Sequence, residues 1–152
     1  MADRRMVQWQ DSYSVGVAVI DGQHKGLIEA TNELYGNCLR GGEAAEVHFM
    51  KAIQGAVAYI KTHFTTEEAI MERLKYPEFE EHKQEHKDFV AEVLKQVKAF
   101  DEKKQFTPLE FAQFLREWIL NHIAKSDKRY AAYFDTLRQA GTLDEQVFTV
   151  SV

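Results

Sequence analysis

The sequence is poor in several features, and each shortage excludes a class of protein. Cys38 is the only cysteine among 152 residues, which excludes an intramolecular disulfide framework and fits a reducing compartment. No hydrophobic run is long enough to span a bilayer, and the first ten residues, MADRRMVQWQ, lack the apolar stretch of a signal peptide. Lys and Arg number 19 against 24 Asp and Glu, which excludes the basic footprint of a general nucleic-acid binder. We therefore expect a soluble cytoplasmic protein without membrane insertion or a nucleic-acid partner.

Proline and glycine are also scarce, with two and eight residues, which favours long uninterrupted helices. Asp21 is a good N-cap for a first helix, and Gly41-Gly42 would end it. Thr107-Pro108-Leu109-Glu110 combines a cap, a proline at the first helical position and a capping-box glutamate. The apolar periodicity predicts helices over residues 21–40, 43–74, 78–100 and 107–134.

Short connections make sequential helices antiparallel neighbours, so the sequence predicts an all-α, up-down-up-down antiparallel four-helix bundle. The alternating run Ser14–Ile20 would by itself read as a strand, but no second strand of similar quality is available to pair with it. We therefore expect an extended N-terminal arm over residues 1–20 and the bundle over 21–135. Residues 136–152 form a C-terminal tail without an assigned role: a simple tail, an oligomer contact, or the remnant of an attachment to something larger.

Histidines recur beside the apolar stripe of every predicted helix, with Glu67 joining them on the second helix and Asp127 on the fourth, so these side chains should point into the bundle core. Buried imidazoles and carboxylates are unfavourable there unless they are paired or bind metal. His48 lies outside this pattern and is expected on a helix surface. The candidate metal ligands are His24, His63, Glu67, His82, His86, His122 and Asp127.

The spacing of these residues sets their geometry. His63 and Glu67 are four residues apart, as are His82 and His86, so each pair shares one helix face. Asp127 follows His122 by five residues, about 140° around a regular helix. That last pair can share a site only if the site lies to one side or if the helix is locally distorted.

Seven ligands exceed the four that one tetrahedral zinc ion takes, and they suit two metals that share bridging groups. Imidazole with carboxylate suits iron but also zinc, copper or nickel, so the residues alone do not choose the metal. The set is rich in histidine and poor in carboxylate, and it contains no Glu-x-x-His pair of the di-iron carboxylate bundles. We infer a site for reversible binding of a small molecule rather than for substrate oxidation.

These residues resemble a known family. Ile20-Asp21-Gly22-Gln23-His24-Lys25, His63-Phe64-Thr65-Thr66-Glu67-Glu68, His82-x-x-x-His86 and Trp118-Ile119-Leu120-Asn121-His122 to Asp127 are similar in order and spacing to the motifs of bacterial hemerythrins. The resemblance implies reversible O2 binding at a non-haem site of two Fe ions with a bridging oxo or hydroxo group. It implies that His82, His86 and His122 hold one iron, that His24 and His63 hold the other, and that Glu67 and Asp127 bridge both.

The resemblance also implies an apolar O2 pocket of Phe64, Trp118, Ile119 and Ile123 beside the open position of the two-histidine iron. Ile119 stands where many relatives have leucine, and its stiffer β-branched side chain is expected to change pocket shape and access. The expected role is O2 carriage, storage or supply, without enzyme activity, and other small anions could take the open position. The alternatives are an O2- or redox-sensing domain of a chemotaxis-type signalling protein and, less favoured, an enzyme acting on peroxide or NO. The sequence does not identify a protein partner.

Overall fold

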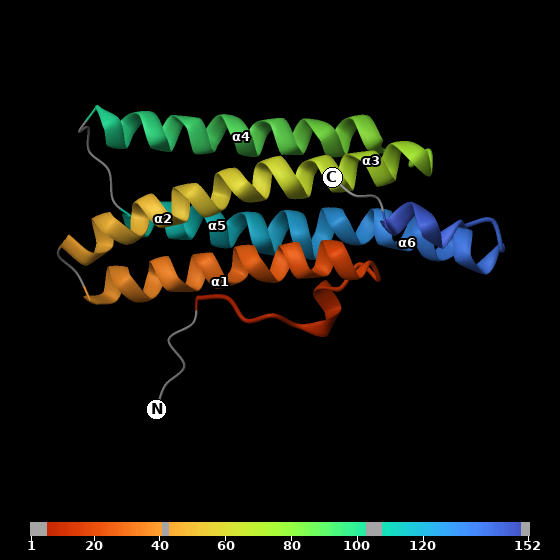
Figure 1. Cartoon of the computed structure of the whole chain (residues 1–152), viewed down its shortest axis with the longest axis horizontal. Coiled ribbons are helices and arrows are strands. Elements are labelled where there is room, and N and C mark those ends of the chain that lie inside the picture. Colours follow the sequence, from red (N-terminus) through yellow and green to blue (C-terminus); the bar gives the residue numbers. More distant parts are fainter. Residues whose placement is uncertain (1–5, 41–42, 103–107, 150–152) are drawn as a thin grey trace.

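The structure is a computed structural model that describes residues 6–40, 43–102 and 108–149. Four helical rods run antiparallel to their sequence neighbours, which confirms the predicted up-down-up-down bundle (Figure 1). No strand occurs in these described parts of the chain. The rods are α1 (Ala18–Arg40); α2 (Glu43–Tyr59), η2 (Ile60–Phe64) and α3 (Thr65–Arg73); α4 (Phe79–Asp101); and α5 (Pro108–Trp118), η3 (Ile119–Ser126) and α6 (Asp127–Gln139).

The first helix begins earlier than predicted. α1 starts at Ala18, so the prediction that Asp21 is its N-cap is wrong, and Asp21 lies in the first turn. Its carboxylate instead accepts hydrogen bonds from the Val15 backbone N–H at 2.9 Å and from the Ser14 hydroxyl. A side chain suited to capping is used here to hold the arm. Gly41-Gly42, the predicted end of the first helix, and Thr107, the predicted N-cap of the fourth, lie outside the described residues.

The fourth rod ends later than predicted, at Gln139 rather than near residue 134. The amide of Gly141, which has φ of 71°, bonds to the Arg138 carbonyl, and that of Thr142 bonds to the Leu137 carbonyl, both at 3.0 Å. This pair of bonds is the Schellman arrangement, in which a glycine adopts the left-handed conformation that terminates a helix.

The N-terminal arm packs along the bundle without pairing as a strand. The Asn32 side chain bonds to both backbone groups of Val7, at 2.9 and 2.7 Å. A short 3-10 turn, η1 (Asp11–Tyr13), interrupts the otherwise extended segment, and the Lys128 ammonium donates to the Ser14 carbonyl at 2.8 Å. The predicted arm is therefore held by side chains of the first and fourth rods.

Part of the C-terminal segment has a packed position. A second 3-10 turn, η4 (Glu145–Thr149), places the Phe148 ring 5.6 Å from that of Phe134. The Arg138 guanidinium lies 5.3 Å over Phe148 and also donates to the Gly16 carbonyl at 3.1 Å and to Glu145 at 3.0 Å. Arg138 of α6 thus contacts both the N-terminal arm and the C-terminal segment.

The buried apolar side chains form two clusters, and each rod passes from one to the other. Along α1, Ile20 belongs to one cluster and Leu27 to the other, with His24 between them. Phe64 and Ile70 flank Glu67 in the same way, as Ile123 and Tyr130 flank Asp127. The polar residues singled out in the sequence therefore occupy one layer between two apolar clusters.

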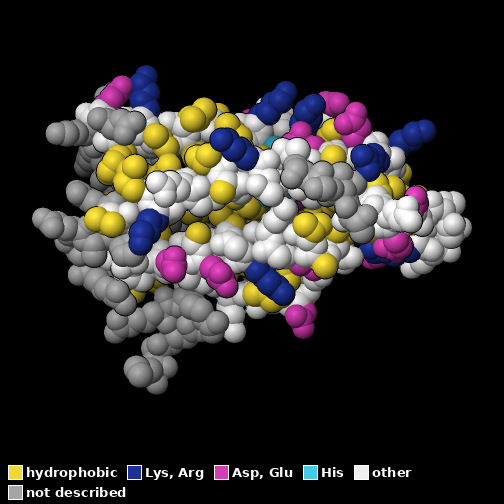
Figure 2. All heavy atoms as spheres, in the orientation of Figure 1, with side chains coloured by type: hydrophobic (Ala, Val, Ile, Leu, Met, Phe, Trp, Pro, Cys, Tyr) yellow, Lys and Arg dark blue, Asp and Glu magenta, His cyan; other side chains and the backbone are white. Residues whose placement is uncertain are grey.

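The surface is mixed in character. Figure 2 shows hydrophobic side chains scattered among charged ones on one face, and exposed hydrophobic residues of α2 include Val47, Met50 and Val57. Among the described helices, none combines the length and the apolar character needed to cross a membrane.

Candidate metal centre

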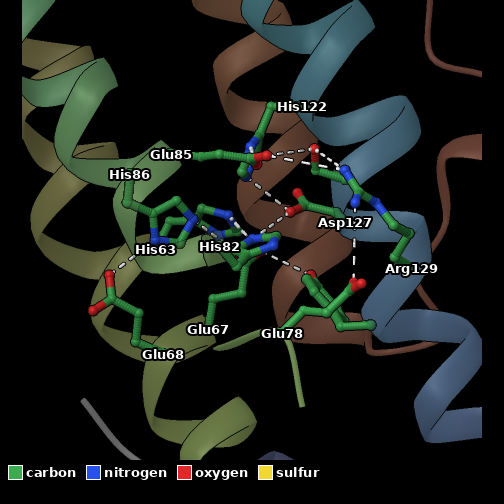
Figure 3. Close-up of polar contacts among 12 residues, drawn as sticks. His63, Glu67, Glu68, Glu78, His82, Glu85, His86, His122, Asp127 and Arg129 are labelled. Atoms are coloured by element: carbon green, nitrogen blue, oxygen red, sulfur yellow. Dashed lines mark hydrogen bonds and ion pairs between the residues drawn. The ribbon is translucent and has the colours of Figure 1, made fainter. Parts of the chain in front are cut away.

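The seven candidate ligands come together in the middle of the bundle. Each of them is at most 4% exposed. One ligand atom each from Glu67, His82, His86 and His122 lies within 4.8 Å of the other three, and the same holds for His24, His63, Glu67 and Asp127. We call these the three-histidine group and the two-histidine group; Glu67 belongs to both. Figure 3 shows most of these side chains converging from neighbouring rods.

Glu67 contacts imidazoles of both groups. Its Oε1 lies 3.1 Å from Nε2 of His82 and 3.0 Å from Nε2 of His86, and its Oε2 lies 2.9 Å from Nε2 of His63. The Tyr130 hydroxyl donates to Oε2 at 2.7 Å. A carboxylate with its two oxygens directed at different groups is placed to bridge two cations.

Asp127 has the same relation to the two groups. Its Oδ1 lies 2.9 Å from Nε2 of both His82 and His122, and its Oδ2 lies 3.0 Å from Nε2 of His24. Although His122 and Asp127 are five residues apart, they meet because η3 is a π-helix and the Asp127 amide bonds to the His122 carbonyl. The local distortion left open by the sequence is therefore present, and such π-turns are frequent at functional sites.

A second π-turn precedes the other carboxylate. η2 spans Ile60–Phe64 and carries His63. Each of the two rods that supply a carboxylate therefore contains a π-turn just before that carboxylate. Wider turns rotate the following residues about the helix axis. Both distortions thus lie where a ligand pair must be aligned.

The polar contacts shift the ionisation of the carboxylates and histidines in opposite directions. Burial alone would raise the pKa of Glu67 and Asp127, but the surrounding imidazoles hold both well below their usual range. Burial would lower the pKa of His24 and His82, yet hydrogen bonds to the two carboxylates raise it to about 9 and about 10. Burial prevails at His63, whose pKa is lowered.

The nitrogen and oxygen atoms of the candidate ligands are arranged to bind metal ions rather than to hydrogen-bond to one another. Nε2 of His86 and of His122 and both oxygens of Asp127 are buried and lack a hydrogen-bond partner of good geometry among the described residues, although partners lie 2.9–3.0 Å away. Buried polar atoms are normally hydrogen-bonded. Lone pairs that converge on shared points, rather than on neighbouring protons, are the arrangement of ligands around a cation.

Aromatic rings surround the imidazoles. Phe64 stacks on His86 and Trp118 stacks on His122, both with ring centroids 3.8 Å apart. These two predicted pocket residues therefore lie against the three-histidine group, and the ring stacked on His63 of the other group is Tyr59 at 4.5 Å. Of the predicted pocket residues, Ile119 and Ile123 are fully buried in the apolar cluster that includes Phe64.

Sequence reasoning missed the residues that support the ligands. Gln23, Glu68 and Glu85 contact the outer ring nitrogens of His63, His86 and His122, and Tyr59 and Tyr130 contact His63 and Glu67. Three of them are direct sequence neighbours of a candidate ligand, and the tyrosines lie one turn away from one on the same face. Their closeness to the ligands in the sequence could have indicated that these residues support the centre. His48 is on α2, but its side chain lies outside the described residues.

A family model described as "Hemerythrin HHE cation binding domain" matches residues 15–134, which is most of the chain. The chain belongs to the hemerythrin family. Among its relatives, a bacteriohemerythrin of Pseudomonas aeruginosa (strain UCBPP-PA14) is 33% identical over 132 residues, covering 87% of this chain and 82% of the relative. A myohemerythrin of Theromyzon tessulatum is 31% identical over 125 residues, covering 81% and 89%.

Solved structures agree with this assignment. A crystal structure of a hemerythrin mutant superposes with a TM-score of 0.73 at 27% identity, covering 84% of this chain and 96% of that one. Membership of the hemerythrin family implies binding of O2 at a non-haem di-iron centre, and the buried cluster of histidines and carboxylates fits a metal site.

The stability of the metal-free hemerythrin should depend on pH. The raised pKa values of His24 and His82 contribute stability that is complete below their usual 6.5 and is lost as the pH rises through about 9 to 10. The lowered pKa values of Glu67 and Asp127 contribute stability above 4.5, which is lost as the pH falls through their lower folded values. We expect the free energy of unfolding in urea, after chelation, to peak between pH 4.5 and 6.5. A constant or rising value from pH 6.5 to 9 would contradict this.

Proposed function

We propose that this hemerythrin binds O2 reversibly through two iron ions, as a carrier, store or supplier of O2. His82, His86 and His122 would hold one iron, His24 and His63 the other, and Glu67 and Asp127 would bridge them together with an oxo or hydroxo group. The iron pair supplies the electrons that reversible O2 binding requires. The proposal includes no second substrate and no catalytic turnover.

One observation carries the proposal: three imidazoles serve one group and two serve the other, while the two carboxylates contact both. When both carboxylates are counted for each position, the two-histidine position has one protein ligand fewer than the three-histidine position. A position short of a protein ligand can take an exogenous molecule, whereas structural metal sites are closed by their protein ligands.

The surrounding side chains exclude water from the candidate ligands and hold their orientation. Ile119, Ile123 and Phe64 are buried with the ligands and keep water away from the layer. Tyr130 donates to Glu67 and so fixes the orientation of that carboxylate. Low-polarity walls disfavour the charge separation that would leave the centre oxidised and unable to bind O2.

The test is the metal content and the absorption spectrum of the reduced protein before O2, after O2 and after its removal. We expect two irons per chain and a visible charge-transfer band that appears with O2 and fades when O2 is withdrawn. Two irons whose band converts directly to a ferric spectrum would exclude reversible carriage and favour redox or peroxide chemistry. Zinc, or no metal, after anaerobic iron loading would overturn the assignment of the seven ligands.

A sensing role has one structural observation in its favour. Tyr130 donates to Glu67 and lies 5.0 Å from Phe134, which contacts Phe148 of the C-terminal segment at 5.6 Å. A change at the shared carboxylate thus has a packed route to η4. Protease digestion of the reduced protein with and without O2 tests this: altered cleavage around 140–149 supports sensing, and identical cleavage removes it.

A further inference from the structure

The two groups of the centre differ in what lies behind their imidazoles. In the three-histidine group, Nδ1 of His86 donates to Oε2 of Glu68 at 2.9 Å. Nδ1 of His122 lies 2.8 Å from Oε2 of Glu85, which is an ion-pair distance without the geometry of a hydrogen bond. Both contacts are made by Nδ1, whereas Nε2 lies 3.0 Å from Glu67 in His86 and 2.9 Å from Asp127 in His122; Figure 3 shows Glu68 beside His86 and Glu85 beside His122. Two imidazoles of this group therefore have a negatively charged partner.

Among the described residues, no such charge lies behind the two-histidine group. Nδ1 of His63 donates to the neutral side-chain carbonyl of Gln23 at 2.7 Å. Nδ1 of His24 is buried and has no hydrogen-bond partner within the described part of the chain. The negative charge of the outer partners is thus confined to one side of the centre.

Glu68 and Glu85 are only partly exposed, and Glu85 has further polar contacts. Their side chains are 24% and 38% exposed, so water screens their charges incompletely. Oε1 of Glu85 accepts a hydrogen bond from the Ser126 hydroxyl at 3.3 Å and lies 3.9 Å from the Arg129 guanidinium.

A carboxylate behind a ligating imidazole fixes which nitrogen bears the proton and makes the ring a stronger donor. We propose that Glu68 and Glu85 are positioning residues that make the three-histidine group the tighter metal position and the one that better stabilises ferric iron. This inference rests on the proposed function, because it requires metal in both groups. It assigns the asymmetry of the centre to the outer partners as well as to the number of histidines.

The first test titrates the metal-free protein with Co2+ without oxygen, so that binding is measured apart from O2 chemistry. We expect two equivalents per chain for the parent. Glu68→Gln and Glu85→Gln should weaken one equivalent about 10- to 100-fold and leave the other unchanged. The matched controls are Glu72→Gln on α3 and Glu80→Gln on α4, which remove an exposed charge from the same helices and should alter neither equivalent.

The reverse change guards against loss of folding as an explanation. Gln23→Glu places a carboxylate behind His63 and should tighten the weaker equivalent, a gain that a damaged fold cannot produce. In the iron-loaded protein, Glu85→Gln should raise the reduction potential. Each tenfold loss of preference for ferric over ferrous iron corresponds to about 59 mV for one electron.

The outcomes separate this inference from the proposed function. If the parent does not bind two metals, the proposed function fails and the inference fails with it. If the parent binds two metals, but the glutamine variants weaken both equivalents alike or neither, only the inference is overturned. An unchanged potential in Glu85→Gln would also overturn it.

Discussion

Loading the metal-free protein with two divalent metal ions is expected to raise its melting temperature by at least about 15 °C. A ligand that binds only the folded state, at a free concentration 1,000 times its Kd, adds about 4.1 kcal/mol, so two positions add roughly 8 kcal/mol. A protein of this size gains about 2–4 °C per kcal/mol. Metal binding is expected to stabilise the fold because buried ligand atoms have no hydrogen bonds of good geometry in the metal-free protein. Both oxygens of Asp127 and Nε2 of His122 are among these atoms.

Calorimetry of the chelated and reloaded protein measures this effect, with iron(II) loaded without oxygen and zinc(II) as a redox-inert comparison. Mg2+ is the control, because it prefers oxygen ligands and retains its water, and it should not shift the transition. Two bound metals with a shift of only a few degrees would mean that the donor atoms are already satisfied in the metal-free bundle.

Glu67→Ala is expected to have the largest effect of any single substitution in the centre. The change removes the partner of His63, His82 and His86, all within 3.1 Å, and of the Tyr130 hydroxyl. Breaking a buried charged pair typically destabilises by about 3–5 kcal/mol. Because Glu67 belongs to both groups, we also expect metal binding at both positions to be lost at concentrations that saturate the parent.

Urea unfolding and metal analysis after gel filtration measure the two consequences separately. Glu72→Ala on the same helix is the matched control, since an exposed substitution should stay within about 0.5 kcal/mol and retain both metals. Glu67→Gln keeps the shape while removing the charge. A Glu67→Ala protein that retains both metals at parental affinity would refute the shared role of this carboxylate.

The sequence was sufficient to predict the four helices and to direct the histidines and the two carboxylates into the bundle core; that they form a layer between two apolar clusters was not predicted. Apolar periodicity placed the four rods, and the histidines three or four residues from the stripe residues had to face inward. His82 and His86 are an example: because they are four residues apart, they lie on the same face of one helix and both point inward. The fold followed from local patterns that all agreed with one another.

What escaped prediction depended on choices between equally good local patterns. Asp21 is as suitable for capping as for holding the arm, and only the packed arm shows that it does the latter. The π-turn that joins His122 to Asp127 was left as one of two alternatives, because the turn satisfies tertiary contacts rather than local propensity. No role was predicted for Glu68 and Glu85, because their partners His86 and His122 come from other helices.

The stacking of Trp118 on His122 has a practical consequence. An indole excited by ultraviolet light loses its emission when an absorbing or paramagnetic ion lies a few ångströms away, and here the two ring planes are inclined by only 11° at 3.8 Å. The chain has one other tryptophan, Trp9, on the arm against Tyr13 and Lys25. With Trp9 replaced by phenylalanine, intrinsic fluorescence would follow the filling and emptying of the centre in dilute solution without an added dye.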